Sequence, residues 1–140
     1  MDFFTALRIS ASGLAAQRTR VDVATSNLAN AQTTRGTDGL PYRRLDPVLE
    51  AAPFDASLDA AAAGIAGVRV AGVVADPGPG RRVFLPGHPD ADADGFVTLP
   101  NVDPIHEVVN LLSASRSYEA NAAAVETLKT MAQRALEIVR

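Results

Sequence analysis

Cysteine and tryptophan are absent from this 140-residue chain, and Lys129 is its only lysine. Without cysteine there can be no disulfide, no thiolate zinc site and no cysteine nucleophile. Aromatic residues make up only 5% of the chain, although 47% is hydrophobic, so a compact core built on large side chains is disfavoured. The abundant alanine instead favours long helices that approach one another closely.

Other features are also missing. The net charge is only −3 and no basic run occurs, so we expect no nucleic-acid partner. No apolar run approaches the ~20 residues of a membrane span. The start, MDFFTALRIS, lacks the charged, apolar and cleavage regions of a Sec signal peptide. Export would therefore need another route.

Proline and glycine divide the chain into three segments. Residues 1–31 contain no proline and one glycine, residues 32–102 hold eight of the nine prolines and nine of the ten glycines, and residues 105–140 hold neither. Because these residues interrupt helices, we predict an N-terminal helix over 1–31, an insert with short strands over 32–102, and a C-terminal helix over 103–140. The fold class is mainly α.

Both predicted helices carry apolar residues at alternating spacings of three and four, which is typical of a coiled-coil seam. We therefore predict that they pair as an antiparallel coiled coil. Asp2 is a candidate cap for the first helix, and Asp103 followed by Pro104 is a cap and first-turn pair for the second. The first seam comprises Phe4, Leu7, Ala11, Leu14, Arg18, Val21, Thr25 and Leu28. The second comprises Val108, Leu111, Ser115, Tyr118, Ala122, Val125, Lys129, Ala132, Leu136 and Val139, widened by Leu112, Leu128, Met131, Ala135 and Ile138.

The insert shows strand and turn patterns. Residues 68–74 alternate, residues 76–80 (DPGPG) form a turn, and residues 81–85 are the returning strand of a predicted β-hairpin. Residues 36–46 are a second extended candidate, and residues 55–67 are predicted to be a loop.

Two terminal helices and an irregular insert supply a thin core. The wide apolar face of the second helix cannot be covered by one partner helix, and exposed stripes of this size mark interaction surfaces. We therefore expect assembly into a higher-order bundle. A self-contained monomeric bundle is the alternative.

Several motifs resemble a known family. Residues 10–18 (SASGLAAQR) and 27–34 (NLANAQTT) resemble the N-terminal signature of flagellar rod and hook proteins. Residues 86–92 (PGHPDAD), 95–97 (GFV), 100–102 (PNV) and 114–121 (ASRSYEAN) are similar to proximal-rod members of that family. Residues 47–80 match no part of the pattern.

The resemblance implies a non-enzymatic subunit of the periplasmic rod of the flagellar basal body, without a cofactor or metal. Its terminal helices would build the drive-shaft tube. The implied partners are other rod proteins, the rod base at the inner-membrane ring, and the flagellar type III export apparatus.

Twelve residues are predicted to form the assembly interface. For Asn27 and Asn30, fixing the register between subunits and ordinary capping or exposure both remain open. The resemblance places Arg116 and Tyr118 inside a packed tube. The set is Leu7, Leu14, Val21, Asn27, Leu28, Asn30, Leu111, Arg116, Tyr118, Asn121, Val125 and Leu128.

Two other functions remain as alternatives. Asp90, Asp92, Asp94 and Gly95 match the opening of an EF-hand calcium loop, but position twelve falls on Asn101, where a glutamate is needed. The second alternative is a soluble coiled-coil adaptor that forms no filament. No nucleophile elbow or phosphate loop is present, so we expect no enzyme.

Overall fold

Two long helices dominate the computed structural model, which describes residues 3–53 and 66–138. A small antiparallel β region lies between them in sequence, so the prediction of a mainly α chain is confirmed. The elements are α1 (Phe3–Ala29), β1 (Leu45–Pro53), β2 (Ala66–Ala75), β3 (Arg81–Phe84), β4 (Phe96–Leu99) and α2 (Pro104–Ile138).

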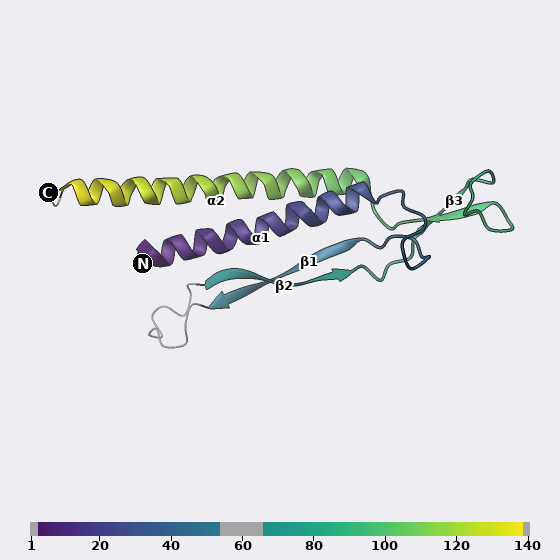
Figure 1. The fold of residues 1–140 in the computed structure, drawn as a ribbon, viewed down its shortest axis with the longest axis horizontal. Coiled ribbons are helices and arrows are strands. Elements are labelled where there is room, and N and C mark those ends of the chain that lie inside the picture. The colour runs from purple at the N-terminus through teal and green to yellow at the C-terminus, as the bar shows by residue number, and fades with distance from the viewer. Residues whose placement is uncertain (1–2, 54–65, 139–140) are drawn as a thin grey trace.

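The two helices lie side by side and run in opposite directions (Figure 1). Their register is visible at two points, where Gly13 lies against Asn121 and Asn27 binds Glu107. A Cβ atom at Gly13 would come within 3.0 Å of the Asn121 amide, so glycine permits the close approach here. Extended along both helices, this register places the start of α1 opposite Met131 of α2. The last turns of α2 therefore project beyond α1 (Figure 1).

The helix ends follow the predicted chemistry where they can be seen. The Asp103 carboxylate accepts a hydrogen bond from the backbone of Ile105 at 2.9 Å, and Pro104 opens α2. This confirms the predicted cap. Asn30 follows the end of α1 and donates from its side chain to the carbonyl of Ser26 at 2.9 Å. The candidate cap at Asp2 lies outside the described residues.

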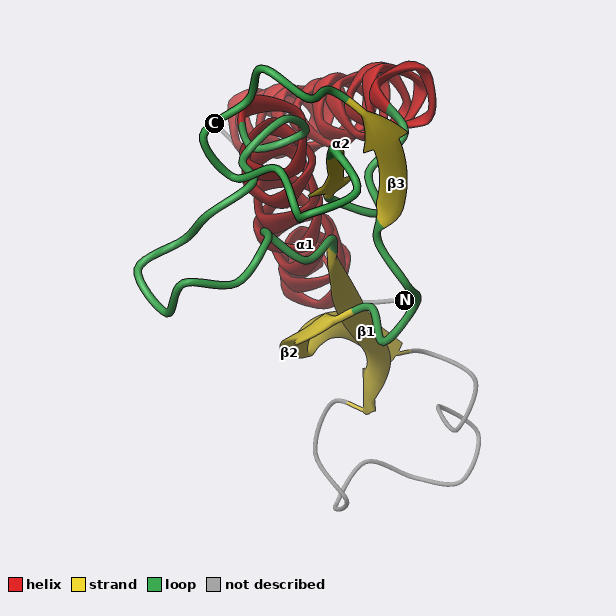
Figure 2. Ribbon diagram, turned by 90° about the vertical axis from the view of Figure 1, so that its right-hand side faces the viewer, coloured by secondary structure: helices red, strands yellow, loops and turns green. Residues whose placement is uncertain are grey.

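The strands pair differently from the predicted hairpin. Strand β2 pairs antiparallel with β1, and β3 pairs antiparallel with β4. Figure 2 shows the β1–β2 ribbon on one side of α1, with α2 on another. The predicted partnership of residues 68–74 with 81–85 is therefore wrong, because the turn at 76–80 leads from one sheet to the other.

The chain itself explains the different pairing. The Ser12 hydroxyl of α1 accepts a hydrogen bond from the Val68 backbone at 3.1 Å, which anchors β2 on the helix. Pro47 and Pro53 obscured β1 in the sequence, since proline cannot donate to a strand ladder. In a two-stranded ribbon both strands are edges, where proline is tolerated.

The other insert predictions met mixed outcomes. The candidate strand at 36–46 is wrong over most of its length, since residues 37–40 form turns and β1 begins at Leu45. The chain at 33–42 closes on itself through hydrogen bonds between backbone groups, including that from Tyr42 to Thr33. The predicted loop at 55–67 falls mostly outside the described residues, but Ala66 and Gly67 belong to β2.

The buried core is small. The chain exposes 9596 Å², whereas a compact protein of 14.6 kDa exposes about 6,900 Å². Within the described residues, the buried hydrophobic side chains fall in two short stretches, 16–31 and 97–114. They are Ala16, Val23, Ala24, Ala31, Val97, Val102 and Ala114.

The predicted seams do not coincide with this core. On α1 every second seam position is exposed, namely Phe4, Ala11, Arg18 and Thr25. The buried stripe of α1 runs through other positions because the helix packs against α2 and against both strands of the β1–β2 ribbon. On α2 the fully buried positions are Glu107 and Ala114 rather than the predicted Val108 and Ser115.

This distribution predicts uneven stability in the isolated chain. We expect backbone amides in residues 3–12 and 121–138 to exchange with solvent on the order of 100-fold faster than those in residues 16–27 and 104–114, because local opening is easiest where few apolar groups are buried. Hydrogen exchange followed by mass spectrometry of the monomer measures this gradient. Uniform protection along both helices would contradict it.

Candidate assembly site

Asn27 lies near the end of α1 and is only 1% exposed. Its amide group makes four hydrogen bonds. The oxygen accepts from the Tyr42 hydroxyl and the Leu45 backbone, each at 2.9 Å. The nitrogen donates to the Leu45 carbonyl at 2.8 Å and to the Glu107 carboxylate at 3.2 Å. A buried amide needs such partners, and Asn27 finds all of them within its own chain.

Glu107 occupies the first turn of α2, where the helix dipole favours a negative charge. Its second carboxylate oxygen accepts a hydrogen bond from the Arg44 guanidinium at 2.6 Å, and the two side chains are 2% and 18% exposed. Burial alone would lower the pKa of Arg44, but hydrogen bonding to Glu107 and the charges of Glu107 and Asp46 outweigh it and hold that pKa above its usual value. The guanidinium of Arg44 therefore keeps its charge at this buried position.

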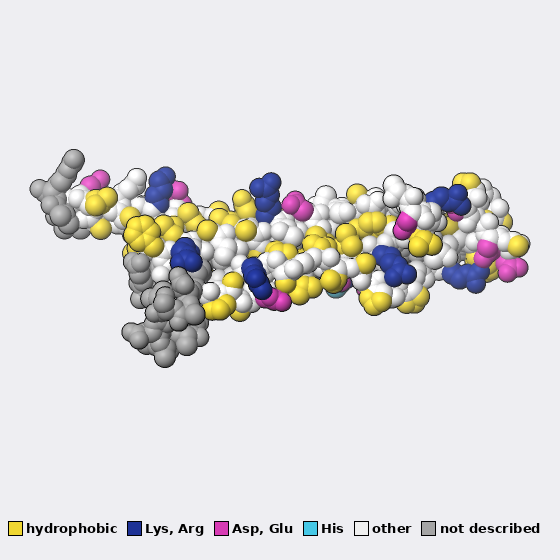
Figure 3. Space-filling view, turned by 60° about the horizontal axis from the view of Figure 1, so that its bottom comes forward, with side chains coloured by type: hydrophobic (Ala, Val, Ile, Leu, Met, Phe, Trp, Pro, Cys, Tyr) yellow, Lys and Arg dark blue, Asp and Glu magenta, His cyan; other side chains and the backbone are white. Residues whose placement is uncertain are grey.

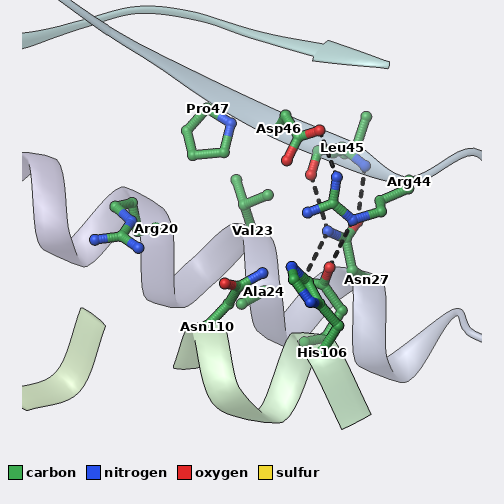
Figure 4. A pocket seen from close by; sticks show the side chains of 11 residues that line it. Arg20, Val23, Ala24, Asn27, Arg44, Leu45, Asp46, Pro47, His106 and Asn110 are labelled. Carbon is green, nitrogen blue, oxygen red and sulfur yellow. Dashed lines mark hydrogen bonds and ion pairs between the residues drawn. The ribbon is translucent and has the colours of Figure 1, made fainter. Parts of the chain in front are cut away.

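One polar network thus links Asn27, Tyr42, Arg44 and Glu107, and we call it the junction cluster. It joins the end of α1, the start of β1 and the start of α2, and Figure 4 shows the dashed contacts that run between them. Asn101 extends the network by accepting from the Arg44 backbone at 3.0 Å. No side-chain nitrogen or oxygen buried in the described part of the chain lacks a hydrogen-bond partner.

A pocket of about 220 Å³ opens beside the junction cluster. Its lining includes Arg20, Asp46 and His106 (Figure 4). Arg44 pairs with both Asp46 and Glu107 here, so these three charged groups of the lining are already engaged with one another.

The predicted interface residues divide by burial. Asn27 is buried and serves the chain's own fold, which differs from both interpretations of the sequence. The hydrogen bonds of Asn30 support its capping interpretation. Arg116 and Tyr118 are exposed. The half-buried members are Leu7, Leu14, Val21, Leu28, Asn30, Leu111, Asn121, Val125 and Leu128.

Sequence reasoning missed Tyr42 and Glu107 as the side-chain partners of Asn27. It also missed Arg44 and Asn101, which extend the network from Glu107. One signal was available for Glu107, since it lies one heptad before Ala114 and two before Asn121, on the face that meets α1. A charged residue on such a face needs a buried partner. The long sequence separation between Arg44 and Glu107 gave no indication of which residue that is.

Two carboxylates of the candidate calcium loop are engaged in contacts with other parts of the chain. Asp92 accepts hydrogen bonds from the backbones of Asp94 and Phe96 and pairs with Arg82. The hydrogen bond from the Phe96 amide is the largest effect on Asp92 and lowers its pKa below the usual value. Desolvation opposes this shift, while the Arg82 side chain and the Asp94 amide add to it. Asp90 binds Thr34 and Arg35. In the described ranges no group of three or more His, Cys, Asp or Glu side chains is placed to hold a metal ion, so calcium binding is not supported.

A set of large apolar side chains remains exposed on the helices. We call it the open face. Figure 3 shows hydrophobic side chains spread along the length of the molecule rather than withdrawn into an interior. The open face comprises Phe4, Ile105, Val108, Val109, Leu112, Tyr118, Met131 and Leu136, which are between 41% and 77% exposed.

Comparison with known proteins decides the family. The family model described as flagella basal body rod protein matches residues 7–36, and that described as flagellar basal body rod FlgEFG protein C-terminal matches residues 93–138. The flagellar basal-body rod protein FlgC of Salmonella typhimurium is 46% identical over 132 residues, covering 93% of this chain and 92% of the relative. The chain belongs to the FlgC family of flagellar basal-body rod proteins.

Similar FlgC proteins occur in other bacteria. That of Bacillus subtilis is 43% identical over 148 residues, covering 99% of each chain. That of Borreliella burgdorferi is 39% identical over 154 residues, covering 100% of this chain and 99% of the relative.

FlgC proteins are structural and non-enzymatic, and the chain is accordingly a structural subunit of the flagellar basal-body rod. The resemblance noted in the sequence is confirmed, and the calcium module and the soluble adaptor lose their support. Asn27 of the junction cluster lies within the residues that the first family model matches, and Glu107 lies within those that the second matches. Within residues 3–53 and 66–138, neither long helix has the apolar character needed to cross a membrane.

Proposed function

We propose that this chain builds the proximal part of the rod by packing its terminal helices against neighbouring subunits, so that they form the wall of the drive-shaft tube. The open face supports this proposal most directly. Eight large apolar side chains are left to water, and a soluble monomer gains nothing from such exposure. Neighbouring helices would cover them.

We infer that the half-buried interface residues act in two directions. Leu14 and Leu128 are partly covered within the chain and partly available outside it. The spacing of apolar residues along each helix fits knobs-into-holes packing. We therefore propose that α1 and α2 pair as an antiparallel coiled coil. In an assembled rod the same seam would extend to the helices of the next subunit.

The proposed partners are other rod proteins and the rod base at the inner-membrane ring. The resemblance to the rod and hook family supports a periplasmic position for this part of the rod. It also supports export through the flagellar type III apparatus. The apolar side chains exposed on both helices suit protein partners.

Deletion of the gene tests the proposed function. We expect basal bodies purified from the deletion strain to retain the inner-membrane ring but to lack the rod and hook, because later subunits would find no base on which to assemble. Electron microscopy of the purified basal bodies gives the result. Complementation with the intact gene is the control, and complete rods in the deletion strain would contradict the proposal.

A further inference from the structure

An exposed aromatic pair lies at the end of the molecule remote from both termini. The rings of Phe84 on β3 and Phe96 on β4 meet edge to face with centroids 5.3 Å apart. Phe84 is 60% exposed, Phe96 36% and the neighbouring Leu85 42%. Figure 1 places β3 at the opposite end from the N- and C-termini. We call Phe84, Leu85, Phe96 and Asp94 the tip.

The tip is held rigidly by polar contacts. Arg82 lies 4.8 Å above the Phe96 ring and is fixed by its ion pair with Asp92. Gly95 has a positive φ of 80°, and a Cβ there would come within 2.9 Å of the Phe84 ring. Only glycine therefore allows the loop to pack against the aromatic pair. The backbone of Leu85 also donates to the Gly95 carbonyl at 2.9 Å.

Rigid, exposed aromatic side chains are typical of residues that dominate binding energy at interfaces. Their ordering costs little when a partner arrives, because the loop already fixes them. Phe84 nevertheless keeps 60% of its surface exposed in the folded chain. The tip therefore has the features of a docking surface separate from the open face of the helices.

The charge at the tip indicates the chemistry of its partner. Asp94 precedes Gly95 in the loop that packs on Phe84 and forms no ion pair with any described residue, whereas Arg82 is neutralised by Asp92. Figure 3 shows acidic, basic and hydrophobic side chains together at this end. A complementary surface combines aliphatic side chains with a basic residue.

The projecting end of α2 shows that terminal helices of rod subunits can present this chemistry. Met131 and Leu136 are 61% and 70% exposed. A hollow of about 370 Å³ on this end is lined partly by Ala123, Met131 and Arg134. Arg134 forms no ion pair within the described ranges. The tip and this helix end lie at opposite ends of one chain, so they can meet only between subunits.

We propose that the tip docks on the projecting end of a terminal helix in another rod subunit, with Phe84 against its aliphatic side chains and Asp94 beside its basic residue. This inference rests on the proposed function, because it requires an assembled rod. It adds a second contact, along the length of the subunit, to the side-by-side packing of helices.

Site-specific cross-linking in assembled rods tests the inference. Phe84 is replaced by p-benzoylphenylalanine, basal bodies are purified and irradiated, and mass spectrometry identifies the cross-linked peptide. The expected peptide comes from the end of a terminal helix of a rod subunit and contains aliphatic residues and an arginine or lysine. The matched control carries the same amino acid at Thr37, an exposed loop position outside the tip, and should not yield this peptide.

Two further variants make the outcome decisive. Asp94→Arg combined with the Phe84 cross-linker should abolish the cross-link, and an unchanged yield would overturn the proposed charge match. Leu85 replaced by p-benzoylphenylalanine provides a second position if the Phe84 variant forms no rods. Rods that assemble but cross-link through another segment, or not at all, overturn the tip proposal and leave the proposed function intact. Rods that assemble without the chain itself overturn both.

Discussion

Replacing Glu107 with alanine should lower the free energy of unfolding by roughly 3–5 kcal/mol, the loss typical when one partner of a buried ion pair is removed. Arg44 would then lose its buried carboxylate partner and keep only the more exposed Asp46, and the nitrogen of Asn27 would lose one acceptor. Because small proteins are stable by only ~5–15 kcal/mol, such a loss is a large fraction of the total. Urea unfolding of the purified chain, followed by circular dichroism, measures it.

Glu50→Ala is the matched control. Glu50 also pairs with an arginine, Arg69, at 3.0 Å, but the two side chains are 48% and 68% exposed. Exposed pairs contribute ~0–1 kcal/mol, so this variant should unfold close to the wild type. Equal losses in Glu107→Ala and Glu50→Ala would show that the junction cluster has no special role in stability.

Replacing Leu112 with aspartate should abolish swimming while leaving the subunit folded. Leu112 is 54% exposed in the isolated chain, so a carboxylate there remains hydrated before assembly. In the rod it would be covered by a neighbouring helix and would lose that hydration without gaining a partner, which costs several kcal/mol per subunit. Swimming in soft agar and circular dichroism of the purified variant give the two readings.

Thr37→Asp provides the control, since Thr37 is exposed on the loop before β1 and outside the open face. It should swim normally. We also expect Leu14→Asp and Leu128→Asp to abolish motility, but both residues are half-buried within the chain, so a folding defect would give the same result. Normal swimming of Leu112→Asp would remove the open face from the assembly interface.

The helices could be predicted from the sequence because their determinants are local. The Asp103 cap, Pro104 and the absence of glycine and proline from 105–140 act within a few residues. The strand pairing was not predictable in the same way. Nothing near Val68 indicates that it will bind Ser12 on α1, 56 residues away in sequence.

The functional residues also divide into those with a local sequence signal and those that depend on contacts distant in sequence. The apolar spacing indicated that the helices would be left with uncovered side chains, and the family motifs identified Asn27. Which stripe of α1 is buried depends on three neighbours, α2, β1 and β2, whereas the periodicity argument assumes only one. The partners of Asn27 and Glu107 come from Tyr42 and Arg44, which lie in a segment without regular structure and hence without a pattern.

The prolines of β1 have a consequence for the time before a subunit reaches the rod. A two-stranded ribbon offers an open edge to which a strand from a second molecule can add, and this is a common start to aggregation. Pro47 and Pro53 remove two donors from one strand, and the irregularity between Val48 and Leu49 bends it. Both features weaken strand addition at β1. In a chain whose helices expose much apolar surface before assembly, they reduce one route to aggregation.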